Sequence, residues 1–126
     1  MRITRISYIL TTKNVPMEYI ARQIAIQPHS IQTEFPPQSI ADPWWSIEVS
    51  SDSASIEEPL VQLIDIILPK LRIIKDLISE YSILSTISIF VRADYEERPE
   101  ISISPSFYSV FEQLNAELVF DIAYEW

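Results

Sequence analysis

The chain of 126 residues contains no glycine, no cysteine and a single histidine. Phosphate-binding loops, dinucleotide-binding fingerprints and nucleophile elbows use glycine where the backbone bends closely around a ligand, so their usual forms are excluded. The lack of cysteine excludes disulfides and thiolate metal sites. One histidine is too few for a Cys/His pair or a site of several histidines. We therefore expect a binding domain and not an enzyme, with no cofactor and no metal.

Positive charge is also scarce, since 9 Lys and Arg stand against 18 Asp and Glu, giving a net charge of −9. Nucleic-acid backbones and anionic membrane surfaces both require clustered basic residues, so neither is an expected partner. The acids concentrate after residue 93, where Arg98 is the only base. They are Asp94, Glu96, Glu97, Glu100, Glu112, Glu117, Asp121 and Glu125. This distribution favours another protein as the partner, with a basic protein as the natural candidate.

Long apolar runs are missing as well. The longest one, residues 60–68, is interrupted by Gln62 and Asp65 and is shorter than the roughly 20 residues of a membrane span. The first residues are polar and alternating, which is not typical of a signal peptide. Hydrophobic residues make up 48% of the chain, enough for one domain over residues 1–126. We predict a single cytoplasmic domain.

Hydrophobic periodicity predicts the elements. Alternation predicts strands at 2–11, 44–50, 83–94, 101–103 and 117–126, with the third and fourth strands forming a hairpin. Spacings of three and four residues predict helices that begin with a cap at Asn14, at Ser55 and at Ser104, and another over residues 71–81. Pro69 should end or kink the second helix, and Asn115 should replace glycine at the end of the last one. The expected fold is α+β, with one mainly antiparallel sheet of about five strands and helices packed on one face.

Trp44 and Trp45 are adjacent in a predicted strand, so their side chains point to opposite faces of the sheet. Trp45 is in phase with Ile47 and Val49 and should point to the core. Trp44 should lie on the uncovered face unless a loop covers it. The same alternation places a mixture of aromatic, hydroxyl and charged residues on that face, namely Arg5, Ser7, Ser46, Glu48, Ser88, Phe90, Arg92, Asp121 and Glu125. Protein interfaces favour such mixtures.

A long proline-containing loop is predicted over residues 27–43. Pro28, His29 and Ser30 at its start could line a small-molecule pocket, in which His29 could act as a base. The sequence identifies no acid that would orient this histidine, so a surface histidine is the simpler interpretation.

Acids cluster at a second predicted turn, where Asp94, Glu96, Glu97 and Glu100 follow the third strand. Their oxygens could bind calcium, but the spacing fits no calcium-binding loop and a solvated turn is the simpler interpretation. Asp121 and Glu125 should lie roughly 13 Å apart along the last strand. This separation is too large for two carboxylates that act on one bond.

The sequence resembles a bacterial family called domain of unknown function 4279 over nearly its whole length. The most specific matches are Pro28 and Ser30 in the loop, Trp45, and the terminal strand with Asp121 and Tyr124. Further matching segments are 17–30, 45–47, 56–71, 101–104, 114–118 and 121–124. The resemblance implies a small cytoplasmic domain and supplies neither an activity nor catalytic residues. The chain departs from the family in lacking the glycines usually found after Pro28 and near the last helix.

Three functions remain open. The first is a protein that binds and neutralises or regulates another protein, for example an immunity protein whose acidic surface covers a basic toxin. The second is a small-molecule-binding or enzymatic domain that uses the loop over 27–43. The third is a structural homo-oligomer in which Trp44 and Phe90 form a symmetric interface. Across the three functions, the expected state is a monomer or a homodimer. We favour the first.

Overall fold

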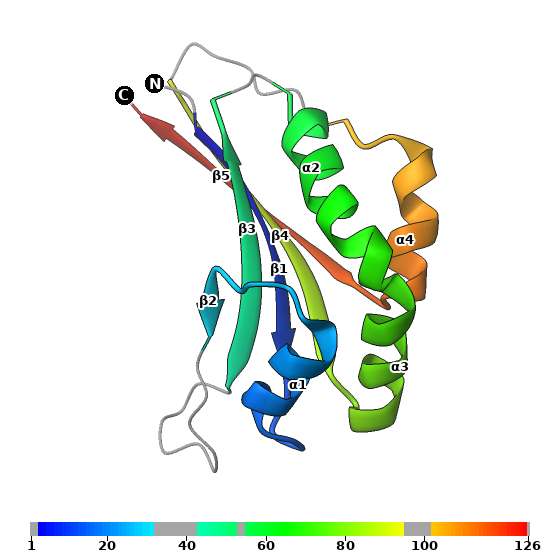
Figure 1. Cartoon of the computed structure of the whole chain (residues 1–126). Coiled ribbons are helices and arrows are strands. Elements are labelled where there is room, and N and C mark those ends of the chain that lie inside the picture. Colours follow the sequence, from blue (N-terminus) through cyan, green and yellow to red (C-terminus); the bar gives the residue numbers. More distant parts are fainter. Residues whose placement is uncertain (1–2, 32–42, 53–54, 95–101, 126) are drawn as a thin grey trace.

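The computed structural model describes residues 3–31, 43–52, 55–94 and 102–125. They form one sheet with the strand order β2-β3-β1-β4-β5, and the helices lie along one face of it (Figure 1). The strands are β1 (Ile3–Thr11), β2 (Ser30–Ile31), β3 (Trp44–Ser51), β4 (Leu84–Asp94) and β5 (Glu117–Glu125). The helices are α1 (Met17–Ile24), α2 (Glu57–Ile67), α3 (Leu71–Tyr81) and α4 (Tyr108–Gln113), with 3₁₀ turns η1 (Leu68–Lys70) and η2 (Pro105–Phe107). The predicted α+β class is confirmed.

The sheet is mixed, because β1 and β3 pair antiparallel with their neighbours whereas β4 and β5 run parallel. The predicted hairpin after β4 is wrong. Residues 102–104 form no strand, and residue 101 lies outside the described residues. The physical reason is that both edges of β4 are already paired, one with β1 and the other with β5 over Thr86–Asp94. The connection through α4 returns the chain to the direction of β4, which is how parallel neighbours are joined.

A fifth strand lies where the sequence predicted only loop. Ser30 and Ile31 form β2, which pairs with Ser46 and Trp45 of β3. Two residues are too few for a recognisable alternation, so periodicity missed this strand. Residues 32–42 of the predicted loop lie outside the described residues.

The core lies between the sheet and the helices. On β1, Ile6, Tyr8 and Leu10 are fully buried, and their partners on β3 and β4 point the same way. Trp45 is fully buried too, as its phase with Ile47 predicted. Helices α1, α2 and α3 contribute the other wall. Their buried side chains are Met17, Ile20, Ile24, Pro59, Leu60, Leu63, Ile64, Ile67, Ile74, Leu77 and Ile78.

One polar pair lies inside this core. The hydroxyl oxygens of Tyr8 and Ser85 are 2.7 Å apart, and the two side chains are 0% and 1% exposed. Burial raises the pKa of Tyr8, so its hydroxyl stays protonated at physiological pH. The pair joins β1 to β4 through side chains and satisfies two hydroxyls that would be costly to bury alone.

Helix α1 is held to the end of α3 and not capped by Asn14. Pro16 is the N-cap residue of α1, and the Asn14 side-chain amide instead donates a hydrogen bond of 2.8 Å to the backbone carbonyl of Tyr81. The rings of Tyr19 and Tyr81 meet edge-on, with centroids 5.8 Å apart. The hydrogen bond from the hydroxyl of Tyr81 to that of Tyr19 raises the pKa of Tyr81 to about 12. The predicted cap at Asn14 is therefore wrong, because the helix begins later, with Pro16 at the N-cap position, and Asn14 bonds to the end of α3 instead.

The predicted cap at Ser55 is one residue off, because the N-cap residue of α2 is Ile56, whose side chain makes no capping hydrogen bond, whereas α3 spans the predicted residues 71–81. The hydroxyl of Ser55 accepts a hydrogen bond from the backbone N–H of Glu57 at 3.1 Å, at the start of α2. Helix α2 ends at Ile67, and Pro69 lies in the 3₁₀ turn that leads directly into α3. No described helix is long and apolar enough to cross a membrane.

Three helices end in residues with left-handed backbone geometry, for which glycine is the usual choice. The φ angles are 57° at Ala25, 53° at Ser82 and 47° at Asn115. The Asn115 prediction is thus confirmed. Asparagine tolerates this region better than alanine, whose Cβ crowds the backbone.

We predict that Ala25→Gly stabilises the protein by about 0.5–1 kcal/mol, because glycine removes the steric cost of the left-handed geometry. Urea unfolding monitored by circular dichroism measures the change. Ala21→Gly is the matched control, since Ala21 lies inside α1 and the same substitution there should destabilise by about 1 kcal/mol. Equal destabilisation by both substitutions would contradict the left-handed geometry at Ala25.

Tyr8→Phe should destabilise the protein by about 1–2 kcal/mol, because the buried hydroxyl of Ser85 loses its partner. Ser85→Ala should destabilise the protein by a similar amount, because the buried hydroxyl of Tyr8 then loses its partner. In the double variant neither hydroxyl remains, so its destabilisation should be smaller than the sum of the two. Thermal unfolding of the four proteins tests this, and simple additivity would show that the two hydroxyls are not coupled.

Candidate functional site

The face of the sheet opposite the helices carries no helix among the described residues (Figure 1). Side chains on this open face come from alternate positions of the strands whose other positions form the core. On β1, for instance, Arg5 is exposed and Ser7 is partly exposed, whereas Ile6 and Tyr8 are fully buried. The strand alternation therefore determines which residues the face presents.

The strand register arranges these side chains in rows across the sheet. In one row Ser7 on β1 pairs with Glu48 on β3 and with Ser88 on β4. In the next row Arg5 pairs with Phe90, which pairs with Asp121 on β5. Together they enclose a hollow of about 250 Å³ that is lined by Arg5, Ser7, Glu48, Ser88, Phe90 and Asp121. The hollow thus gathers one cation, two carboxylates, two hydroxyls and one aromatic ring.

Arg5 lies against the ring of Phe90, with its guanidinium carbon 4.8 Å from the ring centroid. This cation–π contact holds the guanidinium group close to the sheet. A guanidinium group has five N–H donors and no acceptor, so Arg5 offers the hollow directed donors for a carboxylate or carbonyl group.

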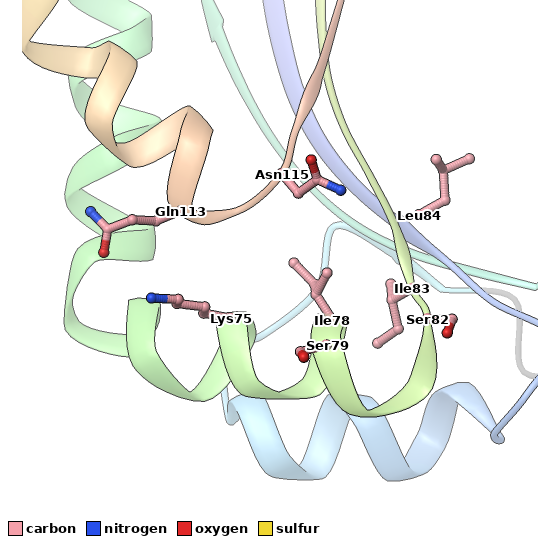
Figure 2. A pocket seen from close by; sticks show the side chains of 8 residues that line it. All are labelled: Lys75, Ile78, Ser79, Ser82, Ile83, Leu84, Gln113 and Asn115. Carbon is pink, nitrogen blue, oxygen red and sulfur yellow. The ribbon is translucent and has the colours of Figure 1, made fainter.

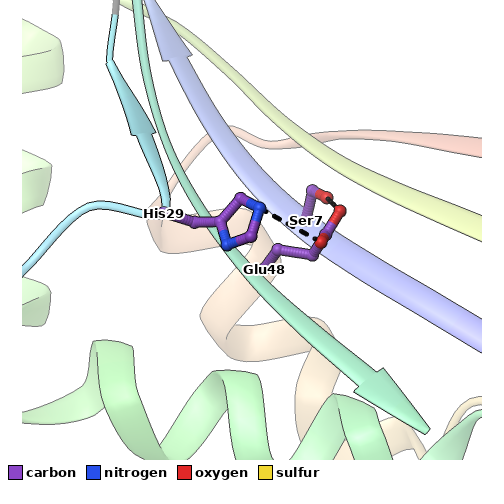
Figure 3. A network of polar contacts seen from close by, with 3 residues as sticks. All are labelled: Ser7, His29 and Glu48. Atoms are coloured by element: carbon purple, nitrogen blue, oxygen red, sulfur yellow. Dashed lines mark hydrogen bonds and ion pairs between the residues drawn. The ribbon is translucent and has the colours of Figure 1, made fainter.

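Glu48 is fixed from two sides (Figure 3). The Ser7 hydroxyl donates a hydrogen bond to Oε1 at 3.3 Å, and Nε2 of His29 lies 3.3 Å from Oε2. The backbone N–H of His29 donates to the carbonyl of Ser46 at 2.7 Å, which anchors the histidine at the edge of the sheet. The carboxylate of Glu48 is therefore held in place in the lining of the hollow.

This contact supplies the acid that the sequence did not identify for His29. The arrangement differs from a hydrolytic triad, in which the histidine lies between the serine and the acid. Here Glu48 lies between Ser7 and His29, so the histidine is not placed to take a proton from the serine. Sequence reasoning assigned His29 and Glu48 to different sites, because their contact depends on the pairing of β2 with β3.

The predicted loop pocket is open in its described part. The side chain of His29 is 58% exposed, and Ser30 begins β2. Pro28 lines two hollows of about 350 and 310 Å³ at the segment that leaves α1, and His29 lines the second of them.

The other predicted partner-binding residues spread along the sheet. Trp44 is partly buried and pairs with Thr11, about 13 Å along β3 from Glu48, and it does not line the hollow. Arg92 and Asp94 are exposed and continue β4 beyond Phe90, with Asp94 paired to Glu125. The rest of the predicted acidic turn, Glu96, Glu97 and Glu100, lies outside the described residues. Within the described ranges, no three His, Asp or Glu residues lie close enough to hold a metal ion.

A larger hollow, of about 490 Å³, was not predicted from the sequence. Figure 2 shows Lys75, Ile78 and Ser79 on α3 across from Gln113 and Asn115, where the ends of α3 and α4 meet the start of β4. The sequence carried one signal for this hollow. Asn115, which was predicted to replace glycine at the end of the last helix and has left-handed geometry, forms part of its lining. Its lining contains one charged side chain, whereas the open-face hollow contains three. The open face is therefore the stronger candidate for recognition.

These features define a class of protein: a small α+β domain with one helix-covered face and one open, charged face. The chain belongs to the family called domain of unknown function DUF4279, whose model matches residues 3–125. No curated protein and no solved structure matches the chain. The expected family membership is confirmed.

We predict that Arg5 and Phe90 are energetically coupled by about 0.5–1 kcal/mol, the usual size of an exposed cation–π contact. The test is a double-mutant cycle with Arg5→Met and Phe90→Leu, which keep apolar volume while removing the charge and the ring. Chemical denaturation gives the four free energies of unfolding. A coupling energy of zero would show that the guanidinium group is not held against the ring.

Proposed function

We propose that this protein is a non-enzymatic binding domain that uses the open face of its sheet to bind another protein. The hollow between Glu48, Arg5 and Asp121 is the observation that carries the proposal. It offers two carboxylates, of which Glu48 is held in place, together with guanidinium donors and an aromatic ring within one concave patch, and protein interfaces use such groups as anchors.

The charge of the chain favours a basic partner. A net charge of −9 attracts a positively charged protein over a distance and repels acidic competitors. Glu48 is the best-placed anchor, because Ser7 and His29 already hold its carboxylate and little side-chain entropy would be lost on binding. A protein that neutralises a basic toxin or regulates a basic enzyme in the cytoplasm would fit this surface.

The local chemistry supports binding and not catalysis. Ser7 donates its hydroxyl to a carboxylate, and His29 contacts that same carboxylate from the opposite side. Neither contact activates a nucleophile. The hollow is therefore better suited to receiving a side chain than to transforming a substrate.

The immobilised protein should retain a basic protein from a lysate of its native cells at low salt and release it at high salt. Ser88→Arg should weaken this retention about ten-fold, because it fills the hollow and adds a cation beside Arg5. Quantitative mass spectrometry of the retained proteins measures the effect.

Gln62→Arg is the matched control, because Gln62 is an exposed polar residue on α2, on the other side of the molecule. It should retain the partner as the unmodified protein does. If the unmodified protein and Ser88→Arg retain the same proteins in the same amounts, the open face is not the binding surface. If no basic protein is retained at low salt, the proposed function is wrong.

A further inference from the structure

The two edges of the sheet differ sharply. At one edge lies β2, whose two residues pair with Ser46 and Trp45 and so cover only part of β3 among the described residues. At the other edge lies β5, nine residues long and paired on one side only, with β4. A long edge strand presents a row of free N–H and C=O groups that can pair with another strand. Proteins usually block such an edge, and β5 is the longest edge strand in the part of the chain that the structure describes.

The side chains of β5 are also unusually apolar for an exposed edge. Phe120 is 44% exposed and Tyr124 is 47% exposed, although both occupy positions on the helix-covered face. The helices bury Leu118 and Ile122 only partly. Val119, on the open face, is 39% exposed. An added strand beside β5 would cover Phe120 and Tyr124 on the helix-covered face and Val119 on the open face.

The charge of β5 identifies the kind of strand that fits. The strand contains three acids and no Lys or Arg. The acids lie on its open face, and the helix-covered face carries Leu118, Phe120, Ile122 and Tyr124. Glu117 and Asp121 are exposed and share the open face with Val119. A second copy of β5 would bring acid toward acid, and like charges on neighbouring strands destabilise the pairing. A strand with basic residues on one face and apolar residues on the other matches both faces of β5.

We propose that β5 binds an extended segment of a partner protein, in which basic residues alternate with apolar ones, as an additional strand of the sheet. This inference rests on the proposed protein-binding function and names where and how a basic partner docks. Main-chain hydrogen bonds along β5 would provide affinity, and the alternation would provide specificity. The edge lies beside the open-face hollow, since Asp121 belongs to both.

The probe is a peptide as long as β5 that alternates lysine with valine and is blocked at both ends. Fluorescence anisotropy should show that it binds at least ten-fold more tightly than a peptide of the same composition with all lysines at one end. Both peptides carry the same charge, so the difference reports two-faced strand pairing and not charge attraction. Amide hydrogen exchange should slow along Glu117–Glu125. Equal affinities, no binding, or slowed exchange elsewhere would overturn the inference.

Substitutions separate the edge from the rest of the surface. Glu117→Lys should weaken peptide binding about five-fold by replacing cross-strand attraction with repulsion. Phe120→Lys should weaken it at least as much, because it places a charge where the peptide presents its apolar face. The matched controls are Asp65→Lys and Val61→Lys, which likewise replace an acid and an apolar residue by lysine at exposed positions of α2 and should leave the affinity unchanged. Equal weakening by the controls would overturn the inference.

The retained native partner distinguishes this inference from the proposed function. If Ser88→Arg reduces retention and both β5 variants do not, the open face binds the partner and the strand-addition inference is wrong. If no basic protein is retained and the alternating peptide still slows exchange in β5, the edge binds strands and the proposed function is wrong. A dimer of the unmodified protein in light scattering, lost in Phe120→Lys, would assign the edge to a second copy and overturn the inference.

Discussion

The alternation of side chains along β1 is the constraint on which the rest of this structure depends. Strand β1 lies in the centre of the sheet and pairs antiparallel with β3 and β4 over nearly its whole length. Its inward residues, Ile6, Tyr8 and Leu10, are fully buried under the helices, so a slip of one residue would expose all of them. The same alternation presents Arg5 and Ser7 on the opposite face. The core and the candidate site are thus two sides of one strand.

The absence of glycine constrains how this chain ends its helices. Ala25, Ser82 and Asn115 take the left-handed geometry that glycine usually provides, and each one turns the chain from a helix toward the sheet. The bend at Asn115 leads from α4 into β5 and so completes the parallel crossover from β4. Ser82 and Asn115 both line the hollow at the ends of α3 and α4. The absence of glycine therefore excludes the usual phosphate-binding loops and nucleophile elbows, but it does not prevent the helix ends that this α+β fold requires.

Charge and exposure divide the surface into parts with different roles. The helices bury most of their apolar residues, whereas the open face combines acids with the half-buried ring of Phe90, and β5 combines acids with the exposed rings of Phe120 and Tyr124. On the open face, Glu48 is held by Ser7 and His29, and Arg5 lies against the ring of Phe90. This part of the face is therefore arranged in advance of any binding. Pre-arranged groups lose less entropy on association than free ones. This physical difference is why we assign recognition to the sheet and support to the helices.

The sequence by itself determined the α+β class, most of the strands and helices, the inward position of Trp45 and most of the open-face residues. These predictions rest on local periodicity and capping chemistry, which neighbouring residues in the chain decide. Only the tertiary structure decided that β5 pairs parallel to β4, that β2 exists, that Asn14 bonds to Tyr81, and that His29 meets Glu48. Each of these depends on partners far apart in the sequence, so no local pattern encodes it. Glu48 shows the division clearly, because its face follows from alternation, whereas its contact with His29 follows from the packing of one strand against another.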